Sequence, residues 1–427
     1  MNTDLATQQS ERLVFFTLAQ LCIIILAARI AGSLAARIAQ ATVVGEIIAG
    51  ILLGPSLFGW IMPVPFLWIF HSTPSGPLDV LSQLGLILLM FQVGLEFDFS
   101  HLKKKANRRV VLWIAMASLL LPFATGLGVG FMSAPLFSPE ANRWVSALFV
   151  ATAFSITAVP VLGRIMMELG ITKSRLGVIA ISAAAINDVV GWLLLALVTA
   201  LALAQFQFPL FLAKVFFVFL FVLAWFFFVR PLMKWAVRHF NAGHEISATF
   251  LGIVLVSIFI SGMITSALGI FTIFGGFVMG VILYDEADFA KLWQARVAPF
   301  VSVFFLPIFF TYTGLRTNIA ALDGVWPWIW CGLILILATI SKFAGVYAAA
   351  RISGLNHHQG KIMGVMMNTR ALMELVVINV GYDMGAISEK TFTMLVIMAI
   401  VSTVVTTPLL RRWLPHAQGR HGEVVAT

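Results

Sequence analysis

Asn187 and Asp188 place an amide and a carboxylate inside an apolar stretch that runs from about 176 to 203. A carboxylate in hydrocarbon costs several kcal/mol unless it is neutralised, paired or hydrated. Because intramembrane carboxylates are by default functional, Asp188 is expected to hold a proton or a monovalent cation in turn; a structural ion pair is the alternative. Asn187 is expected either to supply an amide oxygen as a ligand or to hydrogen-bond a neighbouring helix.

A second set of oxygen-bearing groups lies in the segment ATAFSITAVPVLGR. Pro160 has no backbone N–H and obstructs the carbonyl four residues earlier, that of Ile156. The freed carbonyl oxygen lies beside Thr157 in the sequence, and Ser155 precedes it by one residue. This interruption therefore offers candidate cation ligands from Ser155, Thr157 and the backbone.

Three further charged residues occupy apolar windows. Lys342 lies too far from the end of its window at Arg351 to reach the interface, so it needs an acceptor, either Asp188 or the carbonyl end of an interrupted helix. Arg370 and Glu374, in NTRALMELVV, are four residues apart and are expected to share a helix face and pair, first as a scaffold. Solvated or packing roles are expected for four other carboxylates: Glu46, Glu96, Asp98 and Glu168.

The composition defines the elements that must position these residues. The chain has 427 residues, of which 60% are hydrophobic and 11% charged, with a mean hydropathy of +1.00. A soluble core could not bury that much apolar surface, so the class is an all-α polytopic membrane protein. The net charge of +9 is explained by loop topology, and no nucleic-acid partner is expected.

About thirteen windows have the length of roughly 20 apolar residues needed to cross a bilayer as a helix. They lie near 13–36, 42–58, 78–96, 110–131, 145–167, 176–203, 209–229, 248–268, 270–284, 299–315, 326–350, 361–380 and 391–410. The predicted organisation is a polar N-terminal tail (1–12), a six-helix repeat (13–203), a linking helix (209–229), a second six-helix repeat (248–410) and a short cytoplasmic tail (411–427).

Loop charge predicts the orientation. With the N-terminus outside, the loops on the cytoplasmic side contain 19 Lys and Arg residues, against 4 on the other side. Cytoplasmic loops collect basic residues, so the N-terminus is expected outside and the C-terminus in the cytoplasm.

The two halves are related in sequence. TVVGEIIAGILLG from Thr42 aligns with TIFGGFVMGVILY from Thr272, and FQVGLEFD from Phe91 aligns with TYTGLRTN from Thr311. With a linking span between the copies, the second repeat enters the membrane from the opposite side. Inverted-topology repeats of this kind are typical of secondary transporters, whose binding sites lie between interrupted helices near the midplane.

Six ordered motifs, VVGEIIAGILLGPSLFG, LLMFQVGLEFD, SITAVPVLGRI, INDVVGW, FLPIFFTYTGLRTN and NTRALMELVVINVG, resemble the monovalent cation:proton antiporter superfamily, second branch. The resemblance covers about residues 13 to 411. SITAVPVLGRI and NTRALMELVVINVG look especially like the plant cation/proton exchangers and their bacterial relatives, including Kef-type transporters.

The resemblance implies a sodium/proton antiporter-like fold with two crossed, interrupted helices, a homodimer, and a mobile core that moves like an elevator. It places the ion-binding aspartate on Asp188, the preceding polar residue on Asn187, the unwound crossing on Ser155 and Thr157, and the embedded lysine on Lys342. It implies exchange of Na⁺ or K⁺ for protons in a bacterial inner membrane. The resemblance also implies that the pair Asn187-Asp188 favours electroneutral exchange. No cofactor is implied, and the bound metal would be a monovalent cation at Asp188.

Two other functions stay open on the sequence: a gated potassium efflux pathway, and a sensor or receptor component that binds a cation without transporting it. The short C-terminal tail, without the soluble regulatory domain of many relatives, disfavours the first. An intramembrane enzyme is disfavoured because the sequence has no HExxH or GxSxG motif. The residue pattern does not rank Na⁺ against K⁺ or Li⁺, because selectivity depends on cavity size and a few oxygens.

Overall fold

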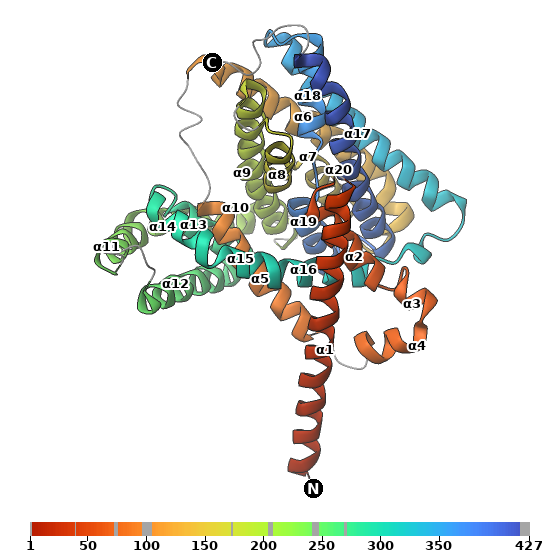
Figure 1. Ribbon diagram of the computed structural model, residues 1–427, viewed down its shortest axis with the longest axis vertical. Coiled ribbons are helices and arrows are strands. Elements are labelled where there is room, and N and C mark those ends of the chain that lie inside the picture. Colours follow the sequence, from red (N-terminus) through yellow and green to blue (C-terminus); the bar gives the residue numbers. More distant parts are fainter. Residues whose placement is uncertain are drawn as a thin grey trace. The chain divides into compact units, whose positions relative to one another are not determined.

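A computed structural model describes residues 2–38, 40–71, 76–95, 105–171, 174–203, 208–240, 247–268 and 271–418. Within these ranges every regular element is a helix (Figure 1). The predicted all-α class is therefore confirmed.

Ten helices among these residues are long and apolar enough to cross a membrane. An eleventh candidate is the pair α18 (His357–Met367) and α19 (Leu372–Asp383), which is bent by 42° at a short break. The other two predicted windows, 145–167 and 270–284, hold a broken pair of short helices and the ten-residue helix α13 (Thr272–Val281). The count of thirteen spans therefore stays a prediction.

The chain divides into two compact units, each of which takes segments from both halves of the sequence. Unit 1 comprises Met1–Ala28, Leu57–Asp98 and Ala196–Tyr312, and unit 2 comprises Arg29–Ser56, Phe99–Leu195 and Thr313–Thr427. Three helices belong partly to each unit: α1 (Asn2–Arg37), α9 (Arg175–Leu203) and α16 (Leu306–Arg316).

Unit 1 is built around α13, which packs against α5 and α12. Its elements are α3 (Phe58–Ile61), α4 (Pro63–Phe66), the π-helix η1 (Leu67–His71), α5 (Gly76–Leu95), α10 (Phe208–Ala224), the π-helix η3 (Trp225–Val229), α11 (Arg230–Phe240), α12 (Ala248–Ala267), α13, α14 (Ala287–Arg296), α15 (Ala298–Phe300) and the π-helix η4 (Val301–Phe305).

Unit 2 contains the predicted functional residues. Its elements are α2 (Thr42–Leu53), α6 (Lys105–Phe137), α7 (Arg143–Ser155), α8 (Val159–Glu168), the 3₁₀ turn η5 (Ile319–Ala321), α17 (Val325–Ile352), α18, α19 and α20 (Glu389–Gln418). Helix α6 packs against α7 and α17, and α17 also packs against α18 and α20. Residues far apart in the sequence are thus brought around the short helices α7, α8, α18 and α19.

Several helices run past the predicted boundaries. Helix α1 begins at Asn2, inside the segment predicted as a polar tail, and α20 continues to Gln418, beyond the predicted end at 410. The predicted linking helix is part of one continuous helical run through α10, η3 and α11. Hydropathy marks only the apolar part of a helix, whereas the backbone hydrogen bonds continue into polar turns.

Matching glycines of the two sequence copies form matching helix crossings. A Cβ atom on Gly314 of α16 would lie 2.1 Å from the carbonyl oxygen of Gly50 in α2. A Cβ atom on Gly280 of α13 would lie 2.9 Å from the Cα of Gly94 in α5. In the sequence alignment Gly280 corresponds to Gly50 and Gly314 corresponds to Gly94. Each crossing therefore joins one helix from each copy, and only residues without a Cβ permit so close an approach.

Candidate functional site

The first break in unit 2 separates α7 from α8. Helix α7 ends at Ser155, and the next residues are not helical: Ile156 has φ −71° and ψ 146°, and Ala158 has φ −85° and ψ 97°. Pro160 follows near the N-terminus of α8. The position of the break agrees with the expectation from Pro160, which cannot return a hydrogen bond to the carbonyl of Ile156.

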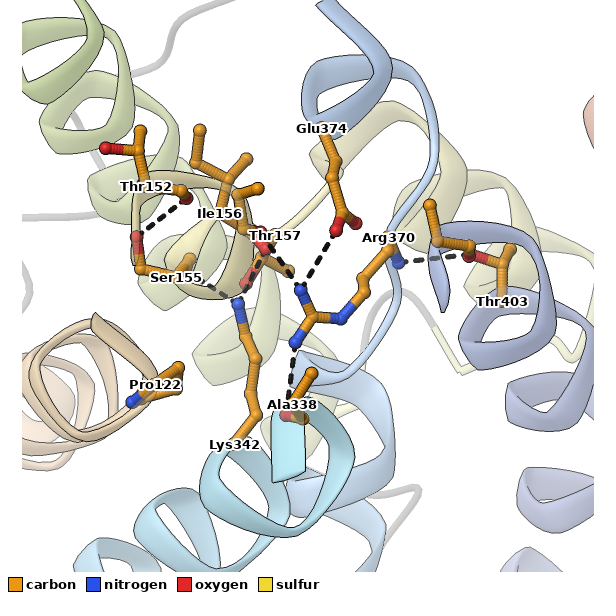
Figure 2. A network of polar contacts seen from close by, with 12 residues as sticks. Pro122, Thr152, Ser155, Ile156, Thr157, Ala338, Lys342, Arg370, Glu374 and Thr403 are labelled. Carbon is orange, nitrogen blue, oxygen red and sulfur yellow. Dashed lines mark hydrogen bonds and ion pairs between the residues drawn. The ribbon is translucent and has the colours of Figure 1, made fainter. Parts of the chain in front are cut away.

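Lys342 of α17 binds the carbonyl oxygens that this break exposes. Its Nζ atom donates to the oxygen of Ser155 and to that of Ile156, each at 2.7 Å (Figure 2). The lysine side chain is completely buried. Of the two acceptors predicted for Lys342, the structure thus shows the carbonyl end of the interrupted helix. Among the described residues, Lys342 forms no ion pair within 4.0 Å with Asp188.

The second break, Asn368 to Ala371, separates α18 from α19 and crosses the first. The backbone N–H of Ala158 donates to the carbonyl oxygen of Thr369 at 3.0 Å. The hydroxyl of Thr157 donates to the carbonyl oxygen of Met367 at 3.2 Å. The predicted pair of crossed, interrupted helices is therefore present, with backbone groups of each break satisfied partly by the other.

Ala371 ends the second break in an unusual conformation. Its φ is 105°, and it is the one residue other than glycine with positive φ among the described ranges. A Cβ atom makes this region costly, so the surrounding contacts must hold the backbone there. One such contact is the N–H of Arg370, which donates to the hydroxyl of Thr403 in α20 at 3.2 Å.

The guanidinium of Arg370 ties three elements together. Nη1 donates to the carbonyl oxygen of Ala153 in α7 at 3.0 Å, and Nη2 donates to that of Ala338 in α17 at 3.1 Å. Nη1 also lies 3.3 Å from Glu374 Oε1, and Figure 2 shows the two side chains facing each other. Both residues are completely buried.

The predicted reason for this ion pair was wrong, although the pair forms. Arg370 lies in the break, and α19 begins only at Leu372, so Arg370 and Glu374 do not share a helix face. The pair instead joins the break to the first turn of the helix after it. An acidic residue in that first turn also faces the positive end of the helix dipole.

Asn187 of α9 hydrogen-bonds two neighbouring elements. Its Nδ2 atom donates to the hydroxyl of Ser118 in α6 and, at 3.4 Å, to that of Thr157 in the first break. Both hydroxyls can accept because their own protons are used: Ser118 donates to the oxygen of Ala115 at 3.0 Å, and Thr157 donates to Met367. The amide therefore serves as an interhelical bridge through its nitrogen and keeps its oxygen for a further donor or a cation.

Like Glu374, whose Oε2 atom also lacks a partner among the described residues, Asp188 is a carboxylate with free capacity in this cluster. It is only 3% exposed, and its Oδ1 atom has no hydrogen-bond partner among the described residues. Val159, in the first turn of α8, and Lys342 both lie near this carboxylate. A buried acceptor without a partner is costly unless a proton or a cation binds it. The arrangement can therefore hold either one.

Ser155 is placed differently from the other candidates. Its hydroxyl donates to the carbonyl oxygen of Thr152 at 2.9 Å, one turn back in α7. Ser155 contributes its backbone carbonyl to Lys342, so the side chain has a local helix-end role in this structure.

Several partners were not found from the sequence, among them the hydroxyls of Ser118 and Thr403 and the carbonyl of Ala338. No residue type marks Ser118 as a partner, although Pro122 lies four residues after it inside α6. No residue type marks the carbonyl of Ala338.

The remaining predicted carboxylates lie outside this cluster or outside what the structure describes. Glu46 is buried and pairs with Arg29 at 3.1 Å, which agrees with a packing role. Glu96, Asp98 and the side chain of Glu168 lie outside the described residues. Within the described residues, no group of three or more His, Cys, Asp or Glu side chains could hold a metal ion.

Known proteins share both this sequence and this fold. The transmembrane sodium/hydrogen exchanger family matches residues 23–414. The Na⁺/H⁺ antiporter NhaS4 of Synechocystis is 37% identical over 404 residues, which cover 93% of this chain and 97% of that protein. Cation/H⁺ antiporter 18 of Arabidopsis thaliana is 36% identical over 393 residues, which cover 92% of this chain but only 48% of that protein.

The solved structure of the sodium proton antiporter MjNhaP1 from Methanocaldococcus jannaschii superposes with a TM-score of 0.67 at 13% identity, covering 94% of this chain and 100% of that one. This likeness shows the sodium/proton antiporter-like fold, as predicted. The match to the exchanger family confirms the resemblance drawn from the six motifs.

Proposed function

This chain belongs to the sodium/hydrogen exchanger family of transmembrane proteins, and from that premise we propose that it is a secondary active antiporter that exchanges Na⁺ or K⁺ for protons. The observation that carries the proposal is the buried Asp188 carboxylate, whose Oδ1 atom has no partner among the described residues, beside two crossed helix breaks. The curated relatives named above are described as Na⁺/H⁺ and cation/H⁺ antiporters, which supports the same function.

Exchange follows from the chemistry of one carboxylate. A charged Asp188 in a buried site is unfavourable, and either a proton or a monovalent cation removes most of that cost. We take it that the site can open to the other side of the membrane only when Asp188 is neutralised. The ion carried in one direction must then be replaced by the other ion before the site can open to the first side again. We assign two further ligands to the cation. They are the amide oxygen of Asn187, the residue before Asp188, and the hydroxyl oxygen of Thr157, which lies in the break between α7 and α8.

Lys342 and the Arg370–Glu374 pair act in this proposal as fixed charges. Lys342 donates hydrogen bonds to two carbonyl oxygens of the break, so it stabilises the non-helical backbone there. It also places positive charge near Asp188. Arg370 holds both breaks and α17 in register through Ala153 and Ala338. Neither needs to change its protonation during transport, because Asp188 alone exchanges the two ions.

The finer features of the proposal rest on the charge count at Asp188 and on the sequence. With Asn187 in place of a second acid, one proton leaves for each cation bound, so exchange is electroneutral. All residues of the proposed site lie in unit 2, which we take as the body that carries the ion in an elevator-type movement. We further propose that the protein is a homodimer in a bacterial inner membrane. Its N-terminus would lie outside and its C-terminus in the cytoplasm.

The test is a flux assay in liposomes that contain the purified protein and an inside-acid pH gradient. Addition of Na⁺, K⁺ or Li⁺ outside should raise the lumenal pH for the wild type but not for Asp188→Asn, which cannot carry the negative charge. The order of the three cations then identifies the substrate. A cation that dissipates the gradient equally well through the Asp188→Asn variant, or no dissipation at all by folded wild type, would overturn the proposal and favour a partner-gated channel or a cation sensor.

A further inference from the structure

Helix α6 presents a groove that the proposed ion site does not use. The groove has a volume of about 610 Å³ and is lined by Arg108, Arg109, Leu112, Trp113, Met116 and Leu120. The four apolar side chains are 43% to 53% exposed. Neither arginine has an ion-pair or hydrogen-bond partner among the described residues.

The spacing of these residues gives the groove two different ends. Arg108, Leu112, Met116 and Leu120 are each four residues apart, so they form one ridge along the helix, and Arg109 and Trp113 form the start of the neighbouring ridge. Both positive charges lie at the first turns of α6, and apolar side chains continue from them for about two and a half turns.

The groove lies within the membrane-spanning part of the helix. The candidate span of α6 begins at Arg108 and ends at Phe137. Twelve residues at 1.5 Å each separate Arg108 from Leu120, or about 18 Å, which is comparable with the ~15 Å thickness of one leaflet's hydrocarbon. A tryptophan close to the arginines is typical of the boundary between headgroups and hydrocarbon.

We propose that this groove is a binding site for an anionic phospholipid, with the phosphate on Arg108 and Arg109 and one acyl chain along Leu112, Met116 and Leu120. Guanidinium groups form bidentate, charge-assisted hydrogen bonds with phosphate oxygens. The apolar floor requires a hydrocarbon chain attached to that phosphate, which a free phosphate ion lacks. A zwitterionic lipid offers the same chain, but its own cationic group competes with the arginines.

The site lies on the helix that supports the proposed ion site from the other side. Ser118, which accepts the hydrogen bond from Asn187, is completely buried on α6 between the exposed residues Met116 and Leu120. The lipid site itself does not depend on the proposed transport function, because it rests on the groove and its two arginines alone.

Native mass spectrometry of the full-length protein tests the proposal, with dioleoyl phosphatidylglycerol as the anionic probe and dioleoyl phosphatidylcholine as the zwitterionic one. Wild type should retain one phosphatidylglycerol per chain more tightly than phosphatidylcholine. Arg108→Gln/Arg109→Gln should weaken that binding by about thirty-fold, since each basic residue contributes a factor of about five at an anionic membrane surface. Arg411→Gln/Arg412→Gln, which removes two adjacent exposed arginines from α20, is the matched control and should bind as wild type does.

Other outcomes discriminate equally clearly. Leu112→Gln/Met116→Gln leaves both arginines in place and should also weaken phosphatidylglycerol, whereas an unchanged affinity would mean that the groove holds no chain. If Arg411→Gln/Arg412→Gln lost as much phosphatidylglycerol binding, the lipid would be held by general surface attraction. If millimolar inorganic phosphate displaced the phosphatidylglycerol, the site would bind an anion without a lipid chain. Either result would overturn the proposal. Thermal melting of each variant in detergent without added lipid checks its fold. Because all six altered side chains are exposed, wild-type melting is expected.

Discussion

The Nζ atom of Lys342 lies 2.7 Å from the carbonyl oxygen of Ile156, the oxygen that Pro160 leaves without a helical partner. The same atom reaches Ser155 at 2.7 Å, so one ammonium group satisfies two buried carbonyls at the break between α7 and α8. The lysine therefore replaces the backbone donors that the broken helix lacks.

Replacing Lys342 should destabilise the protein more than it alters the exchange stoichiometry. Lys342→Ala leaves two buried carbonyl oxygens without a donor, at a cost of about 1–3 kcal/mol each. We expect the melting temperature in detergent to fall clearly, while any remaining cation flux stays coupled to protons. Lys214→Ala, at a half-exposed lysine in the apolar helix α10, is the control and should melt close to wild type. A Lys342→Ala variant with wild-type melting would show that these hydrogen bonds contribute nothing.

Arg370 and Glu374 should differ in how much each contributes to stability. Arg370→Ala removes hydrogen bonds to Ala153 and Ala338 and leaves a buried carboxylate unpaired, which typically costs about 3–5 kcal/mol. Glu374→Gln removes the charge of one partner but leaves both carbonyl contacts of Arg370. The order of melting temperatures should therefore be wild type, Glu374→Gln and then Arg370→Ala.

The double variant Arg370→Ala/Glu374→Gln completes the thermodynamic cycle for that pair. Because Glu374→Gln neutralises the carboxylate that Arg370→Ala would leave unpaired, the double variant should be less destabilised than the sum of the single ones. Strict additivity of the melting shifts would contradict an energetic interaction between the two side chains.

A second acid beside Asp188 should change the number of protons exchanged. Asn187→Asp converts the bridging amide into a group that can take up an additional proton, and it removes the donor to Ser118 and Thr157. Flux in liposomes should then respond to an imposed membrane potential, whereas wild-type flux should not. Asn187→Ala removes the same bridge without adding a charge, so a potential response in both variants would assign the effect to lost packing.

The glycine crossing between α2 and α16 should not tolerate a side chain. A Cβ atom at Gly314 would lie 2.1 Å from the carbonyl oxygen of Gly50, so Gly314→Ala must displace one helix backbone from the other. Reduced melting temperature and reduced flux are expected. Gly332→Ala in α17 is the control, because no atom lies within 4 Å of its Cβ position, and it should be neutral or slightly stabilising. Equal melting of the two variants would contradict the close crossing.

Much of the site followed from residues that break local rules. Carboxylates, amides, ammonium groups and prolines in apolar windows each cost free energy. Asp188, Asn187, Lys342 and Pro160 therefore stand out in the sequence alone. The glycines of the two repeats stand out for a similar reason, because they recur at matching positions. The class of fold and the first break can therefore be predicted from the sequence.

Other features depend on tertiary contacts that no residue type announces. The shared helix face assigned to Arg370 and Glu374 was wrong because Ala371 adopts positive φ, a conformation that glycine or asparagine would have signalled and alanine does not. Ser118 is one of many serines in apolar helices, and only its hydrogen bond from Asn187 sets it apart. The choice of a carbonyl pair as the acceptor for Lys342 likewise required the position of α17 against the break.

In the proposed exchange one carboxylate, Asp188, binds the proton and the cation alternately. The most direct measurement is the apparent KM for the transported cation in liposomes at a series of pH values on the cation-binding side. If both ions compete for Asp188, the KM should rise as the pH falls, by up to about tenfold per pH unit once the group is mainly protonated, while the maximal rate at saturating cation stays constant. A KM that does not change with pH, with protons altering only the maximal rate, would contradict a shared site.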